Sequence, residues 1–218
     1  MNLKDLELTI SYSFTDQELL ETAFQHKSFN KNTNNERLEF LGDSILNSVI
    51  AEYLFINFPN YQEGVLTRAR ALLVKGSSLT KKANEIKLDE IIKLSKGMIN
   101  LSNDRKFSLL EGAFEALIGA IFIDGGWDDV KKVIYQIYQN DFNNLSLDND
   151  FKDPKSLLQE AMQAKGITPP DYHTEELKDQ RFKSSLELKG NLYSATGKSK
   201  KTAETKLAEN ILNKGDFI

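Results

Sequence analysis

Three carboxylates near the start of the chain are spaced so that they could do chemistry together. Glu36, Glu39 and Asp43 lie three and four residues apart, which places all of them on one face of an α-helix. Stacked like charges destabilise a helix by roughly 0.2–0.5 kcal/mol per pair, and Gly42 in the same segment costs about 1 kcal/mol more. A divalent cation bound by carboxylate oxygens would compensate for this cost. The alternative is a solvated acidic face that binds nothing.

A fourth carboxylate, Glu115, lies inside the otherwise apolar run 113–123. A lone buried charge is costly unless it is paired or bound to a metal. Glu115 is therefore the best candidate to complete a cation site, and the alternative is an ion pair with one of the arginines Arg37, Arg68 or Arg70. The chain has no cysteine, so a metal would have oxygen or histidine ligands.

The sequence around these acids resembles the ribonuclease III family. Residues 35–44, NERLEFLGDS, match the family's signature helix without a gap, and residues 113–124, AFEALIGAIFID, are similar to its second acidic motif. The resemblance implies a dimeric, metal-dependent nuclease domain that is all-α. It also implies that Phe40 is an aromatic knob that seats in the partner subunit, although ordinary core packing would equally explain this residue.

The resemblance assigns roles to individual acids. The divalent-metal site, which usually holds Mg²⁺ and for which Mn²⁺ is a possible substitute, is expected at Glu39, Asp43 and Glu115. Glu36 is expected to belong to the same catalytic group, and Glu63 matches a secondary acidic position. His26, in the family-like segment 25–28, is interpreted as structural.

One position departs from the family pattern. Gly112 stands where the family has an aspartate, and Glu111 immediately precedes it. Glu111 and Glu115 are i and i+4 in a helix, so Glu111 is a further candidate ligand. Three outcomes are open: Glu111 substitutes for the aspartate, water fills the position at reduced efficiency, or the site is crippled.

Helices must position these acids. A capping-box pattern at 15–18 predicts a helix through Phe24, and the signature helix is predicted over about 35–58, before Pro59. Another helix is predicted to begin at Glu63. The remaining helices of this all-helical part are predicted over 77–86, 90–94, 106–123 and 127–138.

The pattern changes after a polar, aperiodic linker at 143–150. Asp153 followed by proline predicts an N-cap and a helix start. Strands over 172–177, 182–188 and 192–196 and a helix over 199–212 follow, giving a small α+β domain of α-β-β-β-α order. The predicted division is a nuclease domain at 1–143, a linker at 144–151 and a second domain at 152–218.

The second domain resembles a double-stranded-RNA-binding domain. By this resemblance, Gln159 and Gln163 would meet ribose hydroxyls, while Lys198, Lys200 and Lys201 would span phosphates. A solvated lysine cap is the alternative reading of the three lysines. The segment 175–180 is shorter than the family's loop between the first two strands and lacks its Gly-Pro-x-His-like sequence, which predicts weaker RNA affinity.

Charge and composition agree with this division. The net charge of −4 is the sum of −6 over residues 1–150 and +2 over residues 151–218, which fits a metal site followed by a phosphate-binding module. No stretch resembles a signal peptide or a membrane span. We therefore expect a cytoplasmic protein that uses no small-molecule cofactor.

The leading hypothesis is an Mg²⁺-dependent endoribonuclease that cleaves duplex RNA, such as rRNA and mRNA precursors. Metal-activated water would attack the phosphodiester and leave 5′-phosphates, 3′-hydroxyls and short 3′ overhangs, as in the family. The alternative is a double-stranded-RNA-binding dimer with weakened or lost cleavage, which Gly112 alone supports. A helical metal protein unrelated to RNA would require the match of the second domain to be accidental.

Overall fold

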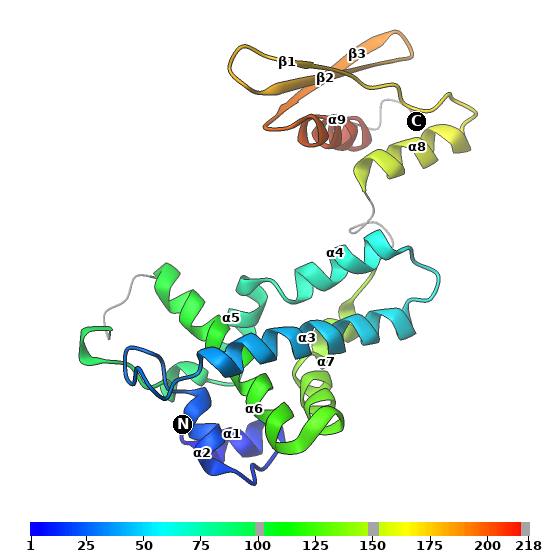
Figure 1. The fold of residues 1–218 in the computed structure, drawn as a ribbon. Coiled ribbons are helices and arrows are strands. Elements are labelled where there is room, and N and C mark those ends of the chain that lie inside the picture. The colour runs from blue at the N-terminus through cyan, green and yellow to red at the C-terminus, as the bar shows by residue number, and fades with distance from the viewer. Residues whose placement is uncertain (99–102, 148–152, 215–218) are drawn as a thin grey trace. The chain divides into compact units, whose positions relative to one another are not determined.

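The chain forms two compact units, Met1–Leu145 and Ser146–Ile218. The computed structural model describes residues 1–98, 103–147 and 153–214. Within these ranges the first unit is helical and its only β contact is an isolated bridge, whereas the second contains three strands and two helices (Figure 1). The predicted all-α domain followed by an α-β-β-β-α domain is confirmed.

Most helices of the first unit pack against the long helix α6. The helices of this unit are α1 (Leu3–Ile10), α2 (Gln17–Ala23), α3 (Glu36–Asn57), α4 (Glu63–Leu73), α5 (Gly76–Glu85), α6 (Asn103–Ile137) and α7 (Gln139–Asn144), with short 3₁₀ turns η1 (Leu88–Glu90) and η2 (Lys96–Met98). Helix α6 joins two helices that the sequence predicts separately, and Gly126, with φ of 78°, marks the bend between them. Helices α1 and α7 are not predicted from the sequence.

Helices α3 and α6 are packed backbone against backbone. A Cβ atom added to Gly42 would lie 1.7 Å from the backbone oxygen of Glu115, and one added to Gly119 would lie 2.3 Å from that of Leu38. Only glycine permits helices to approach this closely. Gly42 is therefore explained by the helix crossing, and the sequence-based argument that it needs a compensating cation is wrong.

Two local predictions are wrong. Helix α2 is capped by Asp16, whose carboxylate accepts hydrogen bonds from two backbone N–H groups, so the expected capping box at Thr15 does not form. No helix covers 90–94, because the Lys93 N–H donates to the carbonyl of Phe24 across the chain, at 2.8 Å. The predicted N-cap at Asp153 and the helix start at Pro154 are confirmed, although the Asp153 side chain makes no cap hydrogen bond.

The second unit packs two helices on one face of a three-stranded antiparallel sheet (Figure 1). Its elements are α8 (Pro154–Ala164), β1 (His173–Glu176), β2 (Phe182–Leu188), β3 (Asn191–Gly197) and α9 (Lys200–Lys214). Alternate leucines of β2, Leu186 and Leu188, are buried with apolar residues of both helices, as the period of a half-buried strand requires.

The predicted linker is less uniform than its composition suggests. Helix α7 continues to Asn144, and Leu147 is buried, so this stretch does contribute to a core. Its remaining residues, 148–151, lie outside the described ranges.

Candidate active site

The α3–α6 crossing brings the predicted acids together. Burial, followed by the charges of Asp43, Glu111 and Glu39 in that order, raises the pKa of Glu115 to about 8. Carboxylates from both helices therefore act on one another as a cluster, which we call the carboxylate cluster: Glu36, Glu39, Asp43, Glu111 and Glu115.

Glu39 occupies the space that an aspartate at position 112 would use. A Cβ added to Gly112 would lie 2.7 Å from the Oε2 atom of Glu39. Burial is the main cause that raises the pKa of Glu39, and the charges of Glu36 and Glu111 also raise it, while Lys27 opposes them. The glycine thus allows Glu39 to fold over α6.

The charge of Glu111 acts on Glu39 and Glu115. Its carboxylate, however, lies against the start of α5. A Cβ added to Gly76, the first residue of α5, would lie 2.7 Å from Glu111 Oε2. The N-terminus of a helix carries partial positive charge and stabilises a carboxylate there. Glu111 therefore contributes to the negative field around Glu39 and Glu115 from a position one residue away from that of the family's aspartate.

The remaining predicted acids are exposed. The Asn47 side-chain amide donates to Asp43 Oδ1 at 2.8 Å. Glu36 forms an ion pair with Lys27, with 2.8 Å between Nζ and Oε1. Glu63, at the start of α4, accepts a hydrogen bond from the hydroxyl of Thr67 at 2.8 Å, and it lies outside the set of carboxylates that act on Glu115.

The donor chemistry of the cluster fits a hard divalent cation. Every candidate ligand is a carboxylate, which Mg²⁺ prefers, and no described ion pair joins Glu115 to Arg37 or Arg70. As the side chains stand, no three described carboxylates or histidines converge on one point closely enough to hold a metal. The carboxylates instead point apart: Glu39 lies over Gly112, Glu111 lies against Gly76, and Asp43 accepts a hydrogen bond from Asn47.

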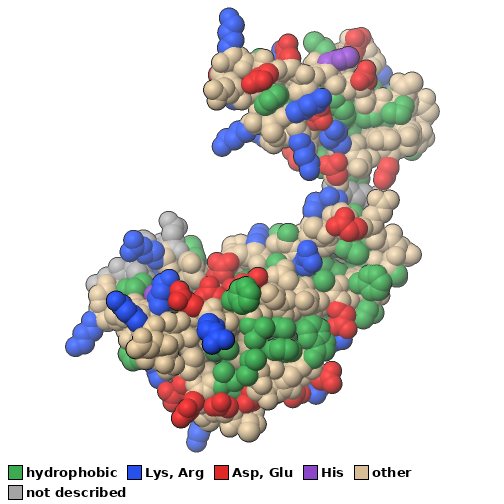
Figure 2. Space-filling model, viewed as in Figure 1, with side chains coloured by type: hydrophobic (Ala, Val, Ile, Leu, Met, Phe, Trp, Pro, Cys, Tyr) green, Lys and Arg blue, Asp and Glu red, His purple; other side chains and the backbone are tan. Residues whose placement is uncertain are grey.

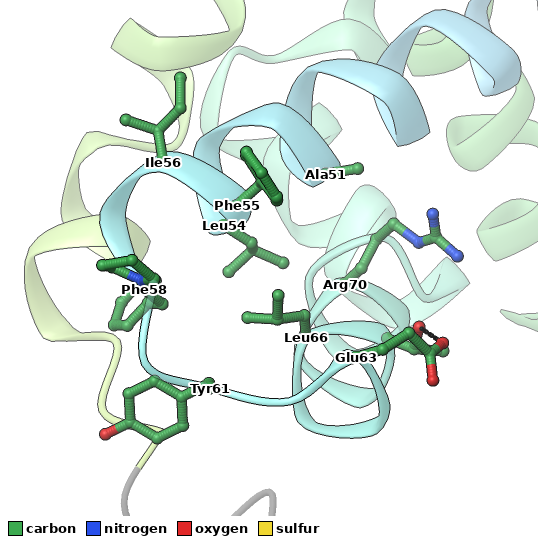
Figure 3. Close-up of a pocket in the computed structure, with 11 residues that line it drawn as sticks. Ala51, Leu54, Phe55, Ile56, Phe58, Tyr61, Glu63, Leu66 and Arg70 are labelled. Carbon is green, nitrogen blue, oxygen red and sulfur yellow. Dashed lines mark hydrogen bonds between the residues drawn. The ribbon is translucent and has the colours of Figure 1, made fainter.

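An apolar pocket of about 700 Å³ lies between the C-terminal half of α3 and α4 (Figure 3). Phe55 at its edge is 74% exposed, and Glu63 lies at its rim. Phe40, on the N-terminal half of α3, is 78% exposed, so core packing does not explain this residue. Figure 2 shows further hydrophobic side chains exposed on the first unit.

The predicted RNA-binding side chains of the second unit are all exposed. Gln159 and Gln163 lie one turn apart on α8. Lys198, Lys200 and Lys201 surround the start of α9, where Ser199 Oγ accepts a hydrogen bond from the Thr202 N–H at 3.2 Å. This arrangement leaves the lysine charges at the positive end of a helix, where anions bind.

Lys27 is a candidate residue that the sequence motifs do not identify. Its neighbour His26 is structural, because its Nδ1 atom accepts a hydrogen bond from the Ser28 N–H at 3.1 Å. A lysine beside that histidine, ahead of an acidic helix, was the available signal.

Comparison with known proteins agrees with this arrangement. Residues 16–142 match a family described as ribonuclease-III-like, and residues 154–214 match the double-stranded RNA binding motif. Ribonuclease 3 of Aliarcobacter butzleri is 40% identical over 214 residues, covering 96% of each chain. Ribonuclease 3 of Nitrosococcus oceani is 39% identical over 93% of this chain and 90% of that one.

A crystal structure of the nuclease domain of ribonuclease III from Campylobacter jejuni superposes with a TM-score of 0.62 at 41% identity, covering 66% of this chain and 99% of that one. A second structure of the same domain is 42% identical, and it is described as flexible in a region involved in dimer formation. No described helix is long and apolar enough to cross a membrane. From its matched domains and its full-length relatives, the chain belongs to the ribonuclease III family of endoribonucleases.

Proposed function

We propose that this chain is a divalent-metal-dependent endoribonuclease that cleaves both strands of duplex RNA. The α3–α6 crossing carries the proposal, because it sets Glu39 and Asp43 against Glu115 in one half-buried, negatively charged site. These three residues would hold Mg²⁺ or Mn²⁺. Bound there, the cation would supply a polarised water and offset charge on the phosphodiester.

The protein's own residues attract the cation and present the substrate. Glu36 and Glu111 strengthen the negative field without needing to touch the cation. The second domain would recognise the A-form shape of duplex RNA through ribose hydroxyls at Gln159 and Gln163 and through phosphates at its three lysines. Hydrolysis is expected to leave 5′-phosphates, 3′-hydroxyls and short 3′ overhangs.

The exposed phenylalanines on one side of α3 support a symmetric homodimer. Phe40, Ser44, Ser48 and Phe55 all face solvent, and their spacing places them on one side of the helix. Two copies of α3 packed antiparallel across a two-fold axis would bring Phe40 of one copy to the C-terminal half of the other. The pocket beside Phe55 would receive it, with Glu63 at the rim.

This pairing predicts that Phe40→Ala converts a dimer into a monomer, as measured by sedimentation equilibrium. Phe29→Ala removes another exposed phenylalanine, one outside α3, and is expected to leave the dimer intact. A wild-type monomer, or an F40A dimer of unchanged affinity, would contradict the pairing.

A second function, RNA binding with little cleavage, is favoured by one observation. Glu111 rests against α5 and leaves the position of the family's aspartate at Gly112 without a carboxylate of its own. Incubation of a long duplex RNA with Mg²⁺ separates the two functions. A ladder of fragments with 5′-phosphate ends supports the endonuclease, whereas a gel shift without cleavage supports the binding protein.

A further inference from the structure

The loop that precedes the carboxylate cluster is fixed on both sides of Lys27. On one side, the carbonyl of Gln25 accepts the Asn35 N–H at 2.9 Å, which joins the loop to the start of α3. The His26 N–H donates to the carbonyl of Lys93 at 3.2 Å, which joins it to the segment after η1. The backbone of Lys27 is therefore held relative to α3.

Ser28 fixes the other side of the loop. Its hydroxyl lies 2.9 Å from Nδ1 of His26 and accepts the Ser95 N–H at 3.2 Å. Burial and the adjacent Lys27 charge lower the pKa of His26. The neutral His26 therefore has a structural role in holding the loop. The exposed charged side chain of this loop segment is that of Lys27.

Lys27 reaches the mouth of the cluster. Its ammonium lies 2.8 Å from Glu36, and its charge acts on Glu39. The Lys27 side chain is 60% exposed and that of Glu36 is 51% exposed, so both are accessible to a large ligand. Exposed ion pairs of this kind contribute little stability, because water solvates both ions well. Lys27 can exchange Glu36 for another anion at small cost.

A phosphodiester that approaches this cluster is repelled by its carboxylates. A fixed cation at the edge lowers that barrier, and phosphate contacts by lysine are the main source of affinity for nucleic acids. We propose that Lys27 binds a backbone phosphate of the RNA beside the cleavage site, and that Glu36 holds Lys27 in position until the RNA arrives. This inference rests on the proposed endonuclease function.

The test compares the full-length wild type with Lys27→Gln, Lys27→Arg and the control Lys31→Gln. Lys31 is exposed on the same connection between α2 and α3 but has no described ion pair. Binding to a fluorescent duplex of about 20 base pairs, longer than one binding domain covers, is measured in EDTA, so that neither metal loading nor cleavage enters. Melting temperatures are measured for every variant.

K27Q is expected to weaken binding several-fold and to make the dependence of log K on log salt shallower by about one unit, the signature of one lost phosphate contact. K27R restores both, and K31Q matches the wild type. In Mg²⁺, single-turnover cleavage by K27Q falls in parallel. The proposal is overturned if K27Q and K31Q behave alike, if the salt dependence is unchanged, or if K27R fails to restore binding. A wild type that binds but does not cleave refutes the nuclease function and leaves this binding test intact.

Discussion

Replacing Gly42 by alanine tests whether the glycine crossing of α3 and α6 holds the site together. The new Cβ would lie 1.7 Å from the Glu115 carbonyl oxygen, and a relaxed contact needs about twice that distance. The clash is with backbone, so the helices themselves must separate. Overpacking of this kind costs about 3 kcal/mol, and the better helix propensity of alanine returns about 1 kcal/mol. We expect a net loss of about 2 kcal/mol.

Urea unfolding followed by tryptophan fluorescence measures this loss in the correct domain, because Trp127 on α6 is the single tryptophan of the chain. Gly64→Ala is the matched control: its Cβ would meet only the Arg68 guanidinium, at 3.5 Å, and the helix propensity of alanine is expected to leave the domain as stable as the wild type or up to about 1 kcal/mol more stable. If G42A is as stable as G64A, the helices are not packed as described.

Two further predictions concern the carboxylates. Gly112→Asp would displace the flexible end of Glu39 and add a ligand, so cleavage at limiting Mg²⁺ is expected to rise about tenfold. Gly112→Asn is the uncharged control, and an unchanged or lower rate would count against any gain from a carboxylate at position 112. The second prediction concerns pH in the absence of metal. The pKa of Glu115 is about 8 in the folded protein, against an ordinary value of 4.5, so between these pH values the folded state binds one more proton than the unfolded state. The contribution of Glu115 to stability is therefore largest at low pH and falls between about pH 4.5 and 8, by about 2 kcal/mol once solvent screening is allowed for. Glu115→Gln is expected to remove that fall in melting temperature, and an identical pH profile in the variant would show that Glu115 is not the group responsible.

The elements that carry strong local patterns were predictable from the sequence. The signature helix, predicted over about 35–58, is observed as Glu36–Asn57, because apolar periodicity and Pro59 define it. The strand Phe182–Leu188 has the predicted bounds, since its leucines alternate. The short helices α1 and α7 were not predicted, and the segment at 90–94 forms no helix because its backbone pairs with a loop some 70 residues earlier.

The candidate site was predicted in composition but not in arrangement. The structure brings Glu39, Asp43 and Glu115 into one field, as the sequence suggested. The sequence alone does not reveal that Gly42 meets Gly119, because that contact joins distant parts of the chain through backbone atoms. The position of the Glu111 carboxylate beside Gly76 and the ion pair between Lys27 and Glu36 likewise depend on helices and loops that meet only in the folded protein.

The most direct test of a metal-dependent carboxylate site is the cleavage rate of a long duplex RNA by the wild type and by Glu115→Gln, measured side by side across Mg²⁺ and Mn²⁺ concentrations. The wild type is expected to cut the duplex with either metal. The variant is expected to bind the RNA equally well but to cut it roughly 100-fold more slowly or worse, because one metal-holding carboxylate is lost while the fold and the RNA-binding domain remain. Equal rates for the two proteins, or a wild type that shifts the RNA without cutting it, would contradict the assignment.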